Sequence, residues 1–98
     1  MQVRIHKSYR EIIAISDSNL LGKTFEQGNA QLEVKEAFFK GEEKTKQEVI
    51  EIIKKMQAED ATFNIVGKES TQTALEAGII QKQEIREIQG IPFTLVLL

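Results

Sequence analysis

The sequence predicts a small α+β domain, a two-layer sandwich in which two helices cover a mixed or antiparallel sheet. Three observations predict this class: strand patterns near both ends of the chain, one strongly amphipathic helix in the middle, and a length of 98 residues. A chain of this length builds one hydrophobic core, so we assign residues 1–98 to a single domain.

The N-terminal part of the chain has the pattern of strands. Val3 and Ile5 alternate with polar neighbours, and residues 12–15 form a β-branched run typical of a strand covered on both faces. Residues 31–35 alternate again and predict a third strand. At least one of the two phenylalanine rings within residues 37–39 should enter the core.

The middle of the chain predicts two helices. Thr45 and Glu48 have the spacing of a capping box, which starts a helix over residues 46–59. Apolar residues then recur at helical spacing (Val49, Ile52, Ile53 and Met56). A shorter helix is expected over residues 69–77 and should end at Gly78.

The C-terminal part predicts strands again. Residues 62–66 are strand-like, and residues 85–89 and 93–98 read as a closing hairpin around Gly90. Pro92 should lie at an edge or bulge, because it cannot donate a ladder hydrogen bond. The last strand is almost wholly apolar, so we expect it inside the sheet and under the helices.

Composition excludes several chemistries. The chain has no cysteine and one histidine, so it can form neither a disulfide nor a thiolate site, and we expect no metal, no cofactor and no catalytic set. His6 falls on the polar face of the first strand, where we expect a solvated side chain. No long apolar run or signal peptide is present, which predicts a cytoplasmic protein without a membrane segment.

Two positions near predicted turns are candidates for binding. Asp17 directly follows a buried strand, where ligand-binding groups often occur, although aspartate is also a common turn residue. Gly67 and Lys68 stand between a strand and a helix, where Lys68, Ser70 and Thr71 could contact an anion or an RNA phosphate. The alternative is a tight strand-to-helix turn at Gly67. A net charge of −2, from 13 basic and 15 acidic residues, disfavours broad RNA binding.

Several short segments, taken in order, resemble the archaeal domain-of-unknown-function family 424. They are Asp17, residues 20–28, residues 32–34, residues 38–42, residues 64–67, residues 74–80 and residues 88–92. The family often has histidine after the proline, where this chain has Phe93, so a role for that histidine would not transfer. The resemblance implies an archaeal cytosolic protein with a compact α+β fold. It also implies an association with translation, because the family's genes lie near translation genes, including that of the beta subunit of initiation factor two.

The resemblance also implies a set of surface residues. Asp17, Gly22, Lys23, Asn64 and Gly67 match the family pattern outside obvious core positions. They could form a shared binding surface. The competing explanation is that the two glycines serve backbone geometry, Gly22 in a turn with positive φ, and that Asn64 makes a turn or sheet bond.

We therefore expect a non-enzymatic binding module that works with the translation machinery through a protein partner. One alternative is a homo-oligomeric structural protein, such as a homodimer, because the apolar last strand could pair at a free sheet edge. The other is a small enzyme acting on a phosphorylated or nucleotide substrate, with Asp17, Lys23 and Lys68 as its candidate residues.

Overall fold

The main feature of the computed structural model, which describes residues 1–97, is a six-stranded mixed sheet. The strand order is β5-β1-β2-β6-β8-β7, and β2 and β6 form the one parallel pair. The strands of this sheet are β1 (Gln2–His6), β2 (Ile12–Ser16), β5 (Glu42–Glu43), β6 (Thr62–Val66), β7 (Arg86–Ile88) and β8 (Ile91–Val96). Strands from both ends of the chain therefore share one sheet, as predicted.

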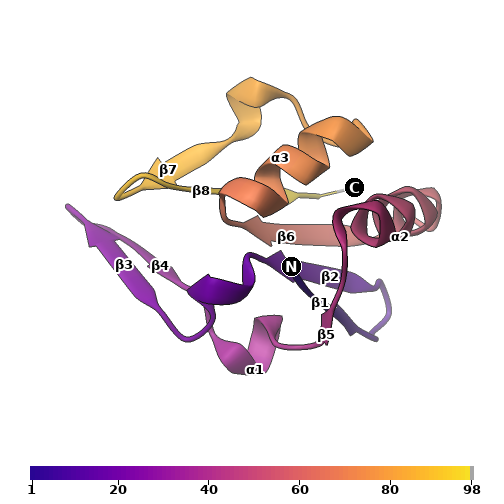
Figure 1. Cartoon of the computed structure of the whole chain (residues 1–98), viewed down its shortest axis with the longest axis horizontal. Helices are drawn as coiled ribbons and strands as arrows, with labels where there is room; N and C mark the ends of the chain where they lie inside the picture. Colours follow the sequence, from indigo (N-terminus) through magenta and orange to yellow (C-terminus); the bar gives the residue numbers. More distant parts are fainter. Residues whose placement is uncertain (98) are drawn as a thin grey trace.

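Both faces of the sheet are covered, but by different elements (Figure 1). The helices α2 (Lys46–Ala58) and α3 (Lys68–Ala77) lie side by side on one face. The other face carries the one-turn helix α1 (Glu36–Phe39) and a separate hairpin of β3 (Thr24–Gln27) and β4 (Ala30–Glu33). The α+β class with a mixed sheet is confirmed, and the sequence missed the third helix and the second sheet.

The alternation of side chains along the strands produces two hydrophobic clusters, one on each face. The larger cluster lies under α2 and α3; among its buried members are Val3, Ile13, Ile15, Val49, Ile53, Met56, Phe63 and Ile65. The smaller cluster lies under α1 and the hairpin, and its buried members are Ala14, Leu20, Val34, Phe39 and Val66. The central strands β2 and β6 thus contribute buried apolar residues to both clusters, which explains the continuous apolar run at residues 12–15.

The predicted helix boundaries are confirmed to within a residue. The Glu48 amide donates to Thr45 Oγ1 at 3.2 Å and the Thr45 amide donates to Glu48 Oε1 at 2.9 Å, which is the capping box that starts α2. These hydrogen bonds, the one from the Thr45 backbone first, lower the pKa of Glu48. Helix α3 ends at Gly78, whose φ of 81° is left-handed, as a C-terminal glycine cap requires.

The prediction of a solvated His6 is wrong. Its imidazole is half-buried and stacks on the ring of Phe38, with 4.5 Å between the centroids. His6 Nε2 lies 2.8 Å from the Phe38 carbonyl oxygen, and because a carbonyl only accepts, Nε2 must carry the hydrogen. The cause is α1, an element that the sequence did not predict and that covers this end of β1.

The apolar last strand is inside the sheet as expected, between β6 and β7, but it is not fully covered. β7 begins at Arg86, opposite Phe93, so its pairing with β8 does not extend past Phe93. Beyond that point Leu95 is 55% exposed and Leu97 is 71% exposed. Leu98, which the prediction included in this strand, lies outside the described residues. Among the helices of residues 1–97, none has the length and apolar character needed to cross a membrane.

Candidate functional site

Asp17 caps helix α3 from another part of the chain. Its Oδ1 accepts hydrogen bonds from the Ser70 amide at 2.8 Å and the Ser70 hydroxyl at 2.7 Å, and its Oδ2 accepts from the Glu69 amide at 3.1 Å. A carboxylate at a helix N-terminus satisfies amides that have no partner within the helix. The amides that we expected to meet an anion are therefore bonded to a side chain of the protein itself.

Gly67 makes this cap sterically feasible. It has a φ of 111°, and a Cβ added there would lie 2.2 Å from Asp17 Cγ. The Thr71 hydroxyl donates to the Gly67 carbonyl at 2.8 Å, so it too is used within the chain. Of the predicted anion contacts, only the exposed Lys68 side chain has no partner among residues 1–97.

Gly22 and Lys23 lie in a different junction. The Gly22 amide donates to the Val34 carbonyl at 2.7 Å, and the Val34 amide donates to the Lys23 carbonyl at 2.9 Å. Gly22 has a φ of 80°, which confirms the predicted turn. These backbone bonds join the chain after β2 to the end of β4, and they place neither residue against Asp17.

Asn64 lies at a third location, in the central strand β6 on the face opposite α2 and α3. Within residues 1–97 its side chain has no hydrogen-bond partner. It lines a hollow of about 390 Å³ that is otherwise mainly apolar, walled by Leu32, Phe38, Val66, Phe93 and Leu95. Phe93, the residue after Pro92, contributes one wall. The structure therefore unites Asp17, Gly67 and Lys68 but leaves the other candidates apart.

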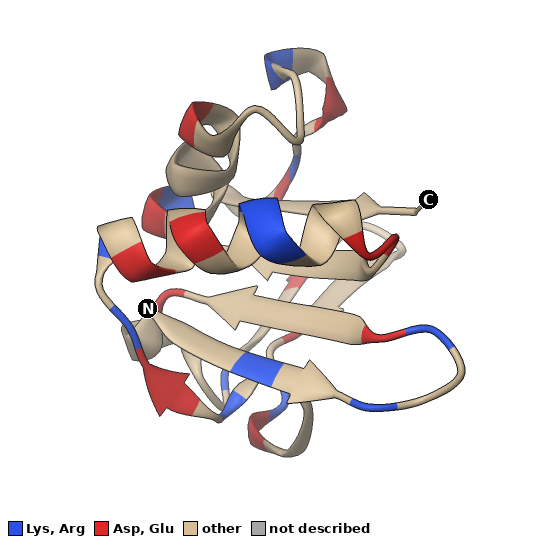
Figure 2. Cartoon of the chain, turned by 90° about the vertical axis from the view of Figure 1, so that its right-hand side faces the viewer, with Lys and Arg blue, Asp and Glu red and all other residues tan. Residues whose placement is uncertain are grey.

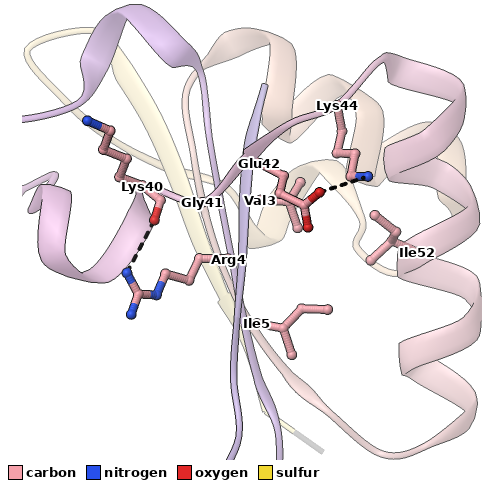
Figure 3. A pocket seen from close by; sticks show the side chains of 8 residues that line it. All are labelled: Val3, Arg4, Ile5, Lys40, Gly41, Glu42, Lys44 and Ile52. Atoms are coloured by element: carbon pink, nitrogen blue, oxygen red, sulfur yellow. Dashed lines mark hydrogen bonds and ion pairs between the residues drawn. The ribbon is translucent and has the colours of Figure 1, made fainter.

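A groove that no sequence pattern predicts lies along the outer edge of β1 (Figure 3). This groove has a volume of about 400 Å³ and we name it the β1 groove. β1 supplies its wall through Val3, Arg4 and Ile5, and the other lining residues are Lys40, Gly41, Glu42, Lys44 and Ile52. Within the described chain, β5 pairs only with Gln2 and Val3 on this side of β1. No other strand of residues 1–97 pairs with this edge beyond Val3, and we refer to that part as the open edge.

The backbone at the open edge has outward-pointing groups. The Lys44 amide donates to the Met1 carbonyl at 2.8 Å, and a Cβ on Gly41 would lie 2.1 Å from the Val3 carbonyl oxygen. The carbonyls of Met1 and Val3 therefore point away from β2. Since successive residues of an antiparallel strand alternate in direction, the N–H and C=O of Ile5 point outward too, beyond the end of β5.

The two sides of the β1 groove differ chemically. Ile5, 42% exposed, and Ile52 of α2 lie on one side of β1 together with the ion pair of Glu42 and Lys44, and Arg4 and Lys40 lie on the other side (Figure 3). Arg4 Nη1 donates to the Lys40 carbonyl at 3.3 Å, the one contact of that guanidinium within residues 1–97. An arginine has five N–H donors, so most of this guanidinium's hydrogen-bonding capacity is unused.

The strand that already pairs with β1 is acidic. β5 consists of Glu42 and Glu43, seen as the red arrow beside the start of β1 in Figure 2. Glu43 Oε2 accepts a hydrogen bond from the Met1 ammonium at 2.5 Å, and its Oε1 accepts from Ser18 Oγ and Gln2 Nε2. These bonds, that of the ammonium first, lower the pKa of Glu43 to about 2. Glu42 pairs with Lys44 at 3.6 Å.

We predict an acid-sensitive contribution to stability from Glu43. Because its pKa is lowered in the folded state, its stabilising effect is complete above its ordinary value of 4.5 and is lost as the pH falls toward about 2. The free energies of unfolding in urea of the parent protein and of Glu43→Gln should therefore differ at pH 6 and converge near pH 2. Glu51→Gln, an exposed change on α2, is the control and should show no such convergence. If the two unfolding free energies differ by the same amount at every pH, Glu43 does not make this acid-sensitive contribution.

Comparison with known proteins places the chain in a family. A crystal structure of an uncharacterized conserved protein from Methanopyrus kandleri has the same fold, with a TM-score of 0.85. The two sequences are 22% identical, and the match covers 97% of this chain and 88% of that one. No curated protein matches the sequence. The model of the family described as "Protein of unknown function (DUF424)" matches residues 5–98, and the chain therefore belongs to the DUF424 family.

Proposed function

We propose that the protein is a binding module that accepts an extended segment of a partner protein as an added strand along the β1 groove. The observation that supports this most strongly is the open edge at Ile5, whose N–H and C=O point outward beyond the end of β5. An open strand edge is a template for pairing with another chain, and several peptide-binding domains work in this way.

The residues around this edge are suited to contact an added strand. An added strand beside Ile5 would continue the line of β5 and would have Ile52 of α2 on one side. Its backbone groups would complete the ladder that β5 begins, and its side chains would alternate between the two sides of the groove. The partner that we expect, from the family's link to translation genes, is a protein of the archaeal translation machinery.

The decisive substitution is Ile5→Pro, which removes the outward N–H without removing a hydrogen bond to β2. Proline is tolerated at edge positions whose N–H does not serve the ladder. We expect the affinity for peptides that bind the protein, selected from a displayed library of random ten-residue sequences, to fall about tenfold. Fluorescence anisotropy of the labelled peptides measures this affinity.

Two control variants make the result specific. Ile5→Val keeps the amide and should retain binding, and Leu95→Ser alters an exposed residue of β8 at a distance from the β1 groove. Thermal unfolding followed by circular dichroism reports whether each variant is folded. Selected peptides that bind folded Ile5→Pro as well as the parent protein, or that depend on Leu95, would overturn the proposal.

A second candidate function, homo-oligomerisation, is favoured by the other edge of the sheet. Beyond Phe93 the outer side of β8 is not paired with β7, and two leucines of this edge, Leu95 and Leu97, are largely exposed. Unprotected apolar edges promote pairing between copies. Light scattering decides this point, because a molar mass of one chain at every concentration would exclude a homodimer.

A further inference from the structure

Resting on the proposed strand addition, we propose that the bound segment is acidic and that its acidic residues alternate with apolar ones. The carboxylates face Arg4 and Lys40, and the apolar side chains face Ile5 and Ile52. The chemical class of the partner is thus a protein with an extended segment of the pattern acidic-apolar-acidic-apolar.

The charges of the β1 groove support an acidic occupant. It is lined by three cations and one acid, and that acid, Glu42, is paired with Lys44. The Arg4 guanidinium has only the Lys40 carbonyl as a partner, and the Lys40 ammonium has none within residues 1–97. Two cationic groups with unused donors therefore flank the open edge, in a protein whose net charge is −2. This local excess of positive charge favours carboxylates in the bound segment.

The strand that already occupies the first part of this edge is acidic. β5, the strand that pairs with the first part of β1, has two residues and both are glutamate. Glu43, opposite Gln2 and so on the same side of β1 as Arg4, is held by the Met1 ammonium, whereas Glu42 pairs with Lys44 of its own segment. A bound segment at Arg4 and Ile5 would continue β5 and repeat, on the Arg4 side, the acid that Glu43 contributes.

The alternation follows from the geometry of the strand. Arg4 and Ile5 are neighbours in β1, so their side chains point to opposite sides of the sheet. In paired strands, residues opposite each other share a side. A residue opposite Arg4 therefore meets its guanidinium, and a residue opposite Ile5 meets that side chain and Ile52. A segment in which acids and apolar residues are not alternating cannot satisfy both sides together.

Synthetic peptides test this directly. We compare four ten-residue peptides with blocked ends: alternating Glu and Val, alternating Lys and Val, alternating Gln and Val, and a block of five Glu followed by five Val. The alternating Glu peptide should bind at least about tenfold more tightly than the other three. Its affinity should fall as sodium chloride is raised, because the ion pairs are exposed.

Charge reversal in the protein provides the matching test. Arg4→Glu should weaken binding of the Glu peptide by about tenfold and strengthen binding of the Lys peptide. Lys82→Glu changes the net charge equally but lies beside the opposite edge of the sheet, and it should leave both affinities unchanged. Arg4→Gln, a milder change, gives the same test should Arg4→Glu not fold.

Three results would overturn the inference. One is equal binding of the Glu and Gln peptides, and another is equal binding of the alternating and block peptides. The third is tighter binding of a ten-nucleotide single-stranded RNA than of the Glu peptide, together with loss of RNA binding in the Arg4→Glu variant. This result would identify a nucleic acid as the occupant. Library peptides that depend on the Ile5 amide but carry no acids would refute this inference while leaving strand addition intact.

Discussion

Replacing Gly67 with alanine is expected to destabilise the protein by about 3 kcal/mol or more, among the largest effects of a single substitution. Two causes combine. The φ of 111° lies in a region that residues with a Cβ adopt only under strain, and the new Cβ would lie 2.2 Å from Asp17 Cγ. Asp17 cannot move aside without breaking its three hydrogen bonds to the start of α3. Urea unfolding measures the loss.

A double-mutant cycle separates the two causes. Asp17→Ala alone should cost about 1–3 kcal/mol, because it leaves the first amides of α3 without their acceptor. In that background Gly67→Ala should cost less than it does in the parent protein, since the carboxylate is gone and only the backbone strain remains. Gly28→Ala, with a φ of 59° and open space around its Cβ, is the control for a positive φ without a steric clash. Additive effects of the two substitutions would contradict the steric part of this explanation.

Gly41→Ala is expected to destabilise by about 3 kcal/mol through a clash with backbone. The added Cβ would lie 2.1 Å from the Val3 carbonyl oxygen, and the main chain of β1 cannot rotate away as a side chain can. The strand β5 should therefore separate from β1, and the contact between Glu43 and the Met1 ammonium should be lost. Because the φ of Gly41 is not positive, backbone strain makes no contribution to this effect.

Unfolding in urea measures the loss of unfolding free energy in Gly41→Ala, and the pH dependence of that free energy identifies the cause. The Gly41→Ala variant should lack the acid-sensitive contribution that we predict for Glu43. Lys40→Ala, at the adjacent position, removes a side chain that makes no ion pair within residues 1–97 and should change stability little. A Gly41→Ala protein as stable as the parent would show that β5 can move without consequence.

Much of the fold could be predicted because its signals are local. The capping box of Thr45 and Glu48, the helical spacing after it and the glycine at position 78 each act within a few residues. What the sequence could not predict depends on contacts between distant segments. Helix α1 has one turn and no side-chain cap, and His6 becomes half-buried only because α1 packs against it.

In the candidate site, too, the sequence does not predict the contacts between distant segments. Asp17 and Gly67 could be singled out from their positions after strands, but their contact joins residues 50 positions apart and gives them a structural role. The openness of the β1 groove depends on β5 beginning only at Glu42, 36 positions after the end of β1 and opposite Val3. No local pattern near Arg4 and Ile5 records where β5 begins, so the sequence does not predict this open edge.

Nuclear magnetic resonance of the ¹⁵N-labelled protein shows whether an extended acidic segment pairs with the open edge of β1. On titration with the alternating Glu and Val peptide, the Ile5 amide should show one of the largest shifts and should become protected from exchange with solvent. The amides of β8 should change little. Shifts concentrated at Asn64 and Leu95, with the Ile5 amide unprotected, would exclude strand addition at β1 and would identify the apolar hollow as the binding surface.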